Sequence, residues 1–534
     1  MKQLLVFSAL FIALFGIVPS SSSQEIQWSN HAGGPGPDNG GPIVIDKFGN
    51  IYFSGIYEGN ECYFLTDTIY QWGYNGMFII KYDTKGNEIW VKRLGNNNVD
   101  IPQQIMDMVY DASSNMIYCT GQIYGTAQGT VFFISKLDTD GNVIWMKIYS
   151  GVSLFSCFSG LVLDENKNIY VTGRIQNTVM FDSIPVAPGG FIARFDSNGN
   201  CIWAKKKIGS NSQVDITGIK YYNNNLFIAG YMTCDKTIFI DTIKIDHKGY
   251  GSSMIMCFDR EGNVQWVTEG ISKMTYSYSD LGMDKTGNIY YTGCFRDTIS
   301  FSGNLLTTWA GMKDLFLVKL DKNGKVQWLK QTSASIAEGI DIISDDNGNT
   351  YVTGYFKGQA TFGNYKITSL SSNDFFLSRY NANGECKGVI NFANGRGNGL
   401  SQDSDGNPSF VVNFEYTTQV GHNTYESYGS SDFIFAKCSA ITGVSEMPRE
   451  QQNRLVIYAN PNTGKCTITM PEEFVNEKNL TLQIFDLNGR LIQQEPVVVT
   501  DGKIKLNIEA QAKGVYTAIL TNGKKSYSGK IVFE

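Results

Sequence analysis

The sequence lacks the short patterns that mark common catalytic and nucleotide-binding sites. It contains no G-x-S-x-G, no H-E-x-x-H and no P-loop motif. Its three histidines, His31, His247 and His422, lie far apart, and its ten cysteines form no C-x-x-C pair, so a zinc site is poorly supported. We therefore predict no catalytic residue, no metal and no cofactor, although the many Asp and Glu residues leave a glycosidase-type carboxylate pair open. Most cysteines are expected to be buried free thiols, with one or two disulfides open.

Excess positive charge and long apolar runs are also lacking. The formal net charge is −6, whereas proteins that bind nucleic acid present a basic face, so nucleic acid is not an expected partner. The N-terminal apolar run, Leu4–Val18, has 15 residues, fewer than the roughly 20 that span a bilayer. With Lys2 before it and small residues after it, this run predicts a signal peptide over residues 1–23. No transmembrane segment is expected in the mature chain.

One phrase recurs along the chain and predicts a β-hairpin. Apolar residues lead to an Asp, a Gly follows two or three residues later, and a short run ends in Trp. Phe78–Trp90 and Phe316–Trp328 are full copies, and further copies end at Trp145, Trp203 and Trp266. Two extended segments joined by a turn with Gly at positive φ produce this pattern.

A second phrase alternates with the first, as in Asp46–Gly55, Asp164–Gly173 and Asp284–Gly293. Looser copies end at Gly121, Gly230, Gly354 and Asn413, which makes seven copies spaced 52 to 66 residues apart. Each period holds two hairpins, and four strands per repeat are typical of a propeller blade. No Trp strand follows the last copy of the first phrase. The segment ending at Trp28, near the N-terminus, resembles the Trp strands and can supply the missing one. We therefore predict an all-β fold in which residues 24–443 form a seven-bladed β-propeller closed by the N-terminal strand.

These alternating phrases resemble the SBBP-type bacterial β-propeller repeats over residues 24–443. The resemblance is to a repeat and not to one protein. It implies a secreted propeller and no particular activity.

The long connections between hairpins are the predicted binding face, because variable loops on a rigid scaffold commonly carry binding sites. They hold aromatic residues that could stack on sugars, and we predict Trp72, Trp309 and Tyr355 as ligand-binding residues. The alternative is that these aromatics, with Tyr57, Tyr124 and Phe356, pack between blades.

Two other recurring features have structural and functional interpretations. The Asp/Asn/Gly turns, such as Asp138–Asn142, resemble the start of a calcium loop, but ordinary hairpin chemistry explains them better.

A cation recurs shortly before the turn. It could belong to an anion-binding ring, or each copy could pair with a turn Asp or cover a Trp ring. These positions are Lys81, Lys136, Arg194, Lys319, Arg379 and Lys437.

The last part of the chain departs from the repeat. Residues 444–454 are polar and predict a linker, and about seven short strands in residues 455–534 predict a small β-sandwich. This tail resembles the type A C-terminal sorting domain of type IX secretion, through Ile457–Gly464, Leu482–Leu491, Gly514–Ile519 and Lys530–Phe533. The resemblance implies passage across the outer membrane, removal of the tail by a sortase-like protease, and release or anchoring at the cell surface.

Two functions remain open from the sequence. The first is a non-catalytic binding or adhesion module on the cell surface or in the medium, with a glycan or a surface protein as its ligand. The second is a glycan hydrolase or lyase on a propeller scaffold. The even repeat and the missing catalytic motifs favour the first. The expected partners are the type IX machinery, the sortase-like protease and that ligand.

Overall fold

A computed structural model describes most of the chain. The described residues are 26–70, 75–94, 103–126, 129–152, 156–208, 214–232, 238–245, 251–276, 280–309, 311–445, 455–471, 474–475, 477, 479–486, 490–497, 502–523 and 525–533. The predicted signal peptide (1–23), Trp72 and residues 446–454 of the predicted linker lie outside them. The chain divides into two units, residues 1–445 and 446–534. No helix among the described residues is long and apolar enough to cross a membrane.

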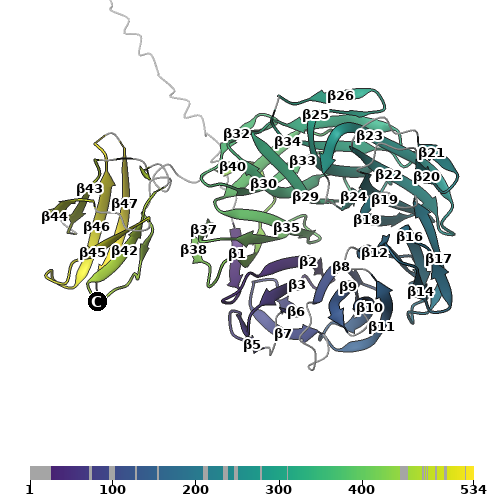
Figure 1. The fold of residues 1–534 in the computed structure, drawn as a ribbon, viewed down its shortest axis with the longest axis horizontal. Coiled ribbons are helices and arrows are strands. Elements are labelled where there is room, and N and C mark those ends of the chain that lie inside the picture. The colour runs from purple at the N-terminus through teal and green to yellow at the C-terminus, as the bar shows by residue number, and fades with distance from the viewer. Residues whose placement is uncertain are drawn as a thin grey trace, which may run out of the picture. The chain divides into compact units, whose positions relative to one another are not determined.

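The first unit is built from antiparallel strands in sets of four, which lie around a common axis and join in places into larger sheets (Figure 1). The innermost strands are β2 (Asn39–Ile45), β8 (Gln103–Asp111), β12 (Cys157–Leu163), β18 (Val214–Tyr222), β24 (Leu281–Met283), β29 (Ile336–Ser344) and β35 (Gly395–Gln402). The second strands are β3 (Ile51–Glu58), β9 (Met116–Thr126), β13 (Ile169–Ile175), β19 (Asn225–Met232), β25 (Ile289–Phe301), β30 (Thr350–Lys357) and β36 (Pro408–Phe414). The third strands are β6 (Asn75–Tyr82), β10 (Gly129–Asp138), β16 (Gly189–Phe195), β22 (Gly251–Asp259), β27 (Asp314–Leu320), β33 (Asp374–Tyr380) and β39 (Asp432–Cys438). The outer strands are β7 (Glu88–Leu94), β11 (Val143–Val152), β17 (Cys201–Ile208), β23 (Val264–Tyr276), β28 (Val326–Thr332), β34 (Cys386–Phe392) and β1 (Ile26–Ala32).

Contacts between innermost strands form a closed cycle. The order is β2, β8, β12, β18, β24, β29, β35 and β2 again. Each sheet is named below by its innermost strand. Two neighbours are also joined directly, because β23 of the β18 sheet pairs with β25 of the β24 sheet. The fold is therefore all-β and of the propeller type.

The first phrase forms the outer hairpin of each sheet, and its buried third strand explains the continuous apolar run. In β27, all residues except Lys319 are buried, because each face of the strand packs on a neighbouring sheet. The turn after it is closed by hydrogen bonds from the Gly324 and Asp321 N–H groups to the Asp321 and Lys325 carbonyls, both 2.9 Å. Gly324 has φ +80°, a conformation that L-residues with a Cβ rarely adopt.

The recurring Trp of each outer strand lies over the turn glycine of the next sheet. In the β18 sheet, Trp266 covers Gly324, and its indole N–H donates to the Lys322 carbonyl at 3.3 Å. A Cβ built on Gly324 would lie 2.6 Å from that ring. The same relation holds for the pairs Trp28–Gly86, Trp90–Gly141, Trp145–Gly199, Trp203–Gly262 and Trp328–Gly384. The recurring Trp and the recurring turn Gly thus contact each other across neighbouring sheets.

Replacing Gly324 by Ala should therefore destabilise the ring for two separate reasons. The positive φ alone should cost about 1–2 kcal/mol, and displacing the Trp266 ring should add about 1–3 kcal/mol. Gly303 is the matched control, because it has φ +84° but no atom within 4 Å of a built Cβ. Chemical denaturation of both variants measures the difference, and equal losses would contradict the contact.

The N-terminal strand pairs with the last repeat, as the sequence predicts. β1 runs antiparallel to β39, and Trp28 pairs with Lys437. The side chain of Trp28 is half-buried, not buried as a closing core residue was expected to be, because it caps Gly86 at the edge of the next sheet. His31 adds a hydrogen-bond contact, with Nε2 2.6 Å from Asp432 Oδ2. Gln331 and Asp314 make the corresponding contact at 2.5 Å in the β24 sheet, so His31 has a structural role.

The chain leaves the ring through the position where one Trp is missing. In the β29 sheet, Gly388 occupies the position that Trp occupies in the other outer strands. It pairs with Arg379, just as Trp328 pairs with Lys319 in the β24 sheet. Strand β40 (Gly443–Ser445) runs parallel to β34 at this position. The buried side chain of Ile441 lies 2.7 Å from a Cβ built on Gly388. Val444 and Ser445, assigned to the linker from the sequence, thus belong to a strand of the ring.

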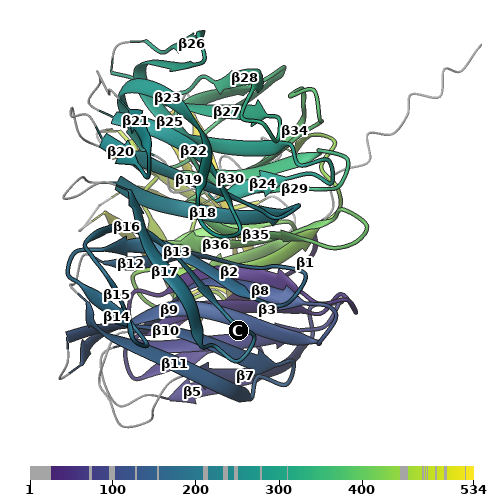
Figure 2. The same ribbon diagram turned by 90° about the vertical axis from the view of Figure 1, so that its right-hand side faces the viewer.

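Most connections between second and third strands fold as small hairpins. They are β4 (Glu61–Tyr63) with β5 (Thr68–Tyr70), β14 (Val179–Phe181) with β15 (Ile184–Val186), β20 (Ile238–Ile240) with β21 (Ile243–Ile245), the end of β25 with β26 (Asn304–Thr307), β31 (Gln359–Phe362) with β32 (Tyr365–Thr368), and β37 (Thr417–Val420) with β38 (Asn423–Glu426). Several pack on the outer strand of the preceding sheet, as β14 does on β11, β20 on β17 and β31 on β28. Hairpins β14–β15 and β20–β21 lie on the same side of the ring in Figure 2. Phe181, Phe362 and Val420 on them are buried, so these connections stitch sheets together.

The second unit has its own core and two antiparallel sheets. One sheet contains β41 (Ile457–Tyr458), β42 (Lys465–Thr469) and β45 (Lys503–Asn507). The other has the order β44 (Leu491–Pro496), β43 (Thr481–Phe485), β46 (Gly514–Thr521) and β47 (Ser526–Phe533). Alternate residues of both sheets, such as Ile468, Ile484, Leu506, Ala518 and Ile531, form one buried cluster.

Candidate functional site

The repeat loses its regularity at one position near the axis. The second strands carry a Gly at Gly55, Gly121, Gly173, Gly230, Gly293 and Gly354, and Val412 takes this place in β36. The sequence-based alignment put Asn413 there, one residue too late. The residue after this position differs from sheet to sheet, and the set is Ile56, Gln122, Arg174, Tyr231, Cys294, Tyr355 and Asn413. Partners on the innermost strands include Asn39, Gln104, Cys157, Asp215, Glu338 and Arg396. We call this set the axial rim.

The side of the ring that carries the axial rim follows from strand direction. The innermost strands run from the rim side to the tight turns that precede the second strands, so the rim lies on the side of the long connections. A regular repeat needs no such variety at one position, which makes the rim the candidate ligand site.

The rim is most polar where the β24, β29 and β35 sheets meet. Glu338 is buried. Its Oε1 accepts a hydrogen bond from the Tyr355 hydroxyl and forms an ion pair with the Lys313 ammonium. The Arg396 guanidinium stands 5.0 Å above the Tyr355 ring. Burial and the bond to Glu338 raise the pKa of Tyr355 above its ordinary value, so the phenol stays protonated as a donor.

Further polar contacts continue around the rim. Arg174 and Asp215 form an ion pair at 2.8 Å between the β12 and β18 sheets. Asn413 donates to the Asn39 side chain at 3.0 Å and accepts from the Gly40 N–H at 2.9 Å. Amide, hydroxyl and charged groups thus alternate at the rim, a composition suited to orienting a hydroxyl-rich ligand.

A second layer lies three to five residues beyond the rim, on or directly before the innermost strands. It consists of Asp107, Asp280, Asp341 and Lys220, and we call it the axial acid layer. Asp107 Oδ2 accepts from the Leu161 N–H of the next sheet at 2.7 Å, and Asp341 Oδ2 accepts from Leu400 in the same way. Lys220 forms an ion pair with Asp280.

Burial raises the pKa of both Asp107 and Asp341 to about 7, and the negative charge of Asp280 adds to the shift. The Lys220 ammonium opposes it. In the unfolded chain an Asp carboxyl ionises near pH 3.8, so the folded protein holds more protons between about pH 4 and 7. The contribution of these groups to stability is therefore lost as the pH rises through this window.

The Asp341→Asn variant should show this linkage. Its melting temperature relative to the wild type should rise between pH 4 and pH 8, because Asn has no proton to lose. Asp138→Asn should show a dependence of the other kind, confined to pH values below about 4: its melting temperature relative to the wild type should rise as the pH falls, because the wild type then loses the stabilising Asp138 charge. Burial raises the pKa of Asp138, but hydrogen bonds from Asn142 and Asp140 outweigh it and lower this pKa overall. Differential scanning calorimetry across the pH range measures both. A pH-independent difference for Asp341→Asn would contradict the assignment.

The residues predicted from the sequence are not brought together. Trp72 lies outside the described residues. Trp309 is 84% exposed in the loop after β26, and no contact described by the structure joins it to Tyr355. Tyr355 belongs to the axial rim. Of the other loop aromatics, Tyr57 and Phe356 are fully buried in β3 and β30, so the packing alternative is correct for these two, and the side chain of Tyr124 is not among those described.

The recurring cations are engaged within the ring. Five of them stand 5.1–5.9 Å over a Tyr of the second strand, not over a Trp; the pairs are Lys81–Tyr52, Lys136–Tyr118, Arg194–Tyr170, Lys319–Tyr290 and Arg379–Tyr351. Lys437 pairs with Asp403 at 2.8 Å. These contacts account for the cations structurally.

The turn carboxylates are likewise occupied by their own turns. Asp138 Oδ1 accepts the Asp140 and Asn142 N–H groups at 3.0 and 2.8 Å, and Oδ2 accepts the Asn142 amide at 2.9 Å. Among the described residues, no group of three or more His, Cys, Asp or Glu is placed to hold a metal ion. Eight described cysteines, Cys62, Cys119, Cys201, Cys257, Cys294, Cys386, Cys438 and Cys466, are not disulfide-bonded.

Comparison with known proteins separates the two units. Residues 456–534 match the family "Secretion system C-terminal sorting domain". The tail is a sorting domain. It indicates export by type IX secretion to the cell surface or extracellular space, and hence an interaction with that machinery.

The ring has more distant relatives. An uncharacterized WD repeat-containing protein of Acanthamoeba polyphaga mimivirus is 24% identical over 387 residues, 63% of this chain. The match spans only 26% of that protein's length. The Dos1 propeller has a TM-score of 0.33 at 10% identity, covering 76% of this chain and 84% of its own. The periplasmic gluconolactonase PpgL of Pseudomonas aeruginosa has 0.33 at 12%, covering 74% and 99%. These structural likenesses are too weak to carry an argument about this chain.

Proposed function

We propose that this protein is a non-catalytic binding or adhesion module, presented at the cell surface or in the medium, whose axial rim binds a glycan. The observation that carries the proposal is the rim itself. A position that follows an almost constant Gly changes from sheet to sheet to Gln, Arg, Tyr or Asn, next to buried Glu338. Variation at one place on a repeated scaffold is the usual sign of a ligand site.

The proposal includes a finer architecture. Residues 1–23 are a signal peptide, residues 24–445 a seven-bladed propeller of SBBP-type repeats, residues 446–454 a linker, and residues 455–534 a small β-sandwich of the type A sorting class. The closed contact cycle of the innermost strands supports the count of blades. In this scheme a sortase-like protease removes the tail after export.

A glycan array probed with the full mature chain tests the ligand class. Where a glycan is bound, Arg396→Ala and Tyr355→Phe should each weaken binding about tenfold, because a lost hydrogen bond to a charged or buried partner costs about 1–3 kcal/mol. Lys366→Ala, on the hairpin β31–β32 and away from the rim, is the control. Loss of binding in Trp309→Ala alone would move the site to the loops, and an array without any bound glycan would contradict the ligand class.

A glycan-active enzyme is the second candidate, and the axial acid layer favours it. A carboxyl that keeps its proton near neutral pH is what a general acid requires, and burial raises the pKa of Asp107 and Asp341 to about 7. Release of reducing ends from a bound glycan, abolished by Asp341→Asn, would establish catalysis. Intact glycan after prolonged incubation would leave binding as the function.

A further inference from the structure

The side-chain contact that closes the ring differs in chemistry from the corresponding contacts in other sheets. In three sheets, the third residue after the Trp position bonds to a residue at the start of the third strand. The pairs are Gln331 with Asp314 at 2.5 Å, Glu269 with Ser252 at 2.7 Å, and His31 with Asp432 at 2.6 Å. Of these three pairs, only the one on the closing strand β1 contains an imidazole, the side chain that exchanges a proton between about pH 5 and 8.

The carboxylate of Asp432 is buried and depends on His31 for a positive charge. Its Oδ2 accepts the Tyr428 N–H at 2.8 Å and contacts His31 Nε2, whereas its Oδ1 has no hydrogen-bond partner among the described residues. The imidazole is only 9% exposed and stacks on the Tyr428 ring, with 4.4 Å between the ring centroids. A Cβ built on Gly33 would lie 2.3 Å from the Asp432 carboxyl carbon, so the backbone of β1 and its continuation closes this side.

A second buried carboxyl, that of Asp38, belongs to the same junction. Its Oδ1 accepts the Glu58 N–H at 2.8 Å and its Oδ2 accepts the Gly34 N–H, so it fixes residues 33–38 to the end of β3. Its backbone N–H donates to the Ser431 carbonyl at 2.8 Å, one residue before Asp432. Burial raises the pKa of Asp38 to about 7, the two N–H donors oppose this shift, and the negative charge of Asp432 adds to it.

The phenol and thiol groups around this junction serve as donors and packing groups. Burial raises the pKa of Tyr57 to about 12, although the Arg93 guanidinium opposes that shift. Burial also raises the pKa of Cys62 and that of Tyr428 above their ordinary values. The Tyr425 hydroxyl, which faces His31 from β38, donates to a backbone carbonyl of β1 at 2.7 Å. The pH dependence of the junction is therefore that of its imidazole and carboxyl groups.

The neighbouring charged groups supply no further cation to the two buried carboxyls. Glu58 on β3 and Glu61 on β4 are carboxylates themselves. Among the described residues, no Lys or Arg forms an ion pair with Asp38 or Asp432. Ionisation of Asp38 and loss of the His31 charge would leave two carboxylates on hydrogen-bonded backbones without compensation, and an uncompensated buried charge is strongly destabilising.

We propose that this junction is a pH-sensitive latch of the ring, which holds β1 and residues 33–38 tightly in acidic solution and loosens as the pH rises toward 7. In acid, Asp38 is uncharged and the His31 imidazolium compensates Asp432. An exposed Asp ionises near pH 3.8, so the closed chain holds more protons than the opened one between about pH 4 and 7. The stabilisation by Asp38 is therefore lost as the pH rises through this window, at the junction where the N-terminal strand meets the last repeat.

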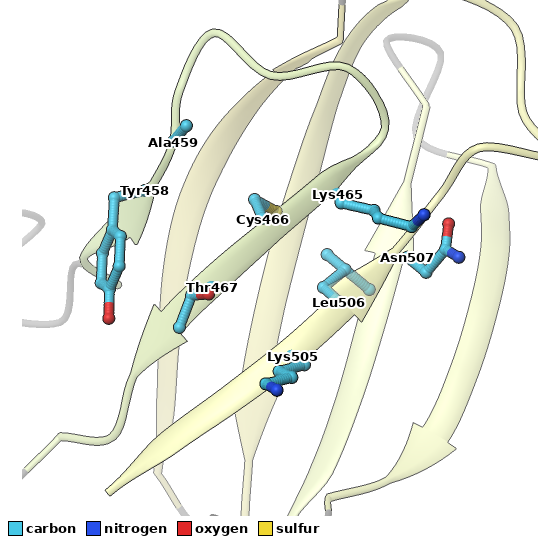
Figure 3. Close-up of a pocket in the computed structure, with 8 residues that line it drawn as sticks. All are labelled: Tyr458, Ala459, Lys465, Cys466, Thr467, Lys505, Leu506 and Asn507. Atoms are coloured by element: carbon cyan, nitrogen blue, oxygen red, sulfur yellow. The ribbon is translucent and has the colours of Figure 1, made fainter.

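Hydrogen–deuterium exchange of residues 24–534, read by mass spectrometry, tests the latch. After correction for intrinsic exchange rates, the amides of residues 26–38 should exchange at least tenfold faster at pH 7.5 than at pH 5, because one linked proton changes an opening equilibrium up to tenfold per pH unit. Peptides of β27 and β28, which contain the contact of Gln331 with Asp314, should change less and report opening of the whole ring. Strands β42 and β45 of the sorting domain, side by side in Figure 3, are a second reference, because no residue labelled there has a carboxyl or imidazole group.

The His31→Gln/Asp38→Asn double variant should reduce the pH effect on residues 26–38 to less than twofold. Gln at position 31 copies the contact of Gln331 with Asp314, and Asn at position 38 keeps an oxygen that can accept the Glu58 N–H. Asp341→Asn is the matched control, because burial raises the pKa of Asp341 to about 7 as well, but this residue lies in the axial acid layer. It should leave the difference between residues 26–38 and β28 unchanged.

Each outcome decides the proposal. An equal pH effect on residues 26–38 and on β28, or faster exchange of residues 26–38 at pH 5, would overturn it. A full pH effect in the double variant, or its loss in Asp341→Asn, would overturn it too. Circular dichroism checks the fold, and if the double variant is unfolded, Asp38→Asn alone decides, since it should lower the pH effect severalfold and an unchanged effect would contradict the latch.

Discussion

Truncation of the chain after Gly523 should abolish export. The truncation removes β47, which pairs along its length with β46 and contributes the buried residues Tyr527, Ile531 and Phe533 to the core of the second unit. Losing three large buried side chains costs several times about 3 kcal/mol, which is comparable with the whole stability of a small domain. The sorting domain would therefore not fold, and the machinery would have no surface to recognise.

A reporter carrying the signal peptide and residues 446–534 measures this effect. We expect surface or extracellular reporter with the full tail and at least a tenfold lower amount after truncation. Val475→Ser, an exposed position in the same unit, is the control and should export normally. A truncated tail that still exports the reporter would show that the fold of the tail is not what is recognised.

Deletion of residues 26–32 should open the ring. This segment is β1, the outer strand of the β35 sheet, and without it β39 presents an unpaired edge. The contacts of Trp28 with Gly86 and of His31 with Asp432 are lost at the same time. We expect a loss of at least about 5 kcal/mol in the free energy of unfolding, with aggregation through the free edge.

Two C-terminal truncations are the matched controls for this deletion. Ending the chain at Ser445 removes the whole second unit but keeps β40, so the denaturation midpoint of the ring should not change. Ending the chain at Ala440 also removes Ile441, whose buried side chain packs beside Gly388. This truncation should lower the free energy of unfolding of the ring by about 2–5 kcal/mol. Soluble, cooperative unfolding of the 26–32 deletion with a wild-type midpoint would show that β1 does not close the ring.

The residues of the axial rim can be found in the sequence, but the sequence alone does not indicate that they form a site. The residue after each repeated Gly differs among Gln122, Arg174, Tyr231 and Tyr355, which is a signal of a specialised position. Loop length drew attention instead to Trp309 and Trp72. The long connections could not be recognised as stitching hairpins, because their strands have three or four residues and are stabilised by the neighbouring sheet, as Ile240 is by Ile208.

Local chemistry let the sequence determine the hairpins, the repeat count indicated the role of β1, and the resemblance to a family indicated the sorting tail. A two-residue alternation and an Asp/Asn/Gly turn act within about ten residues, so each hairpin is encoded where it stands. The tertiary structure alone decided what those hairpins touch. Trp266 covers Gly324, Ile441 replaces a missing Trp at Gly388, and Asp107 and Asp341 reach the next sheet. Such contacts join residues about 50 or more positions apart, and they exist only because the ring of sheets brings distant segments side by side.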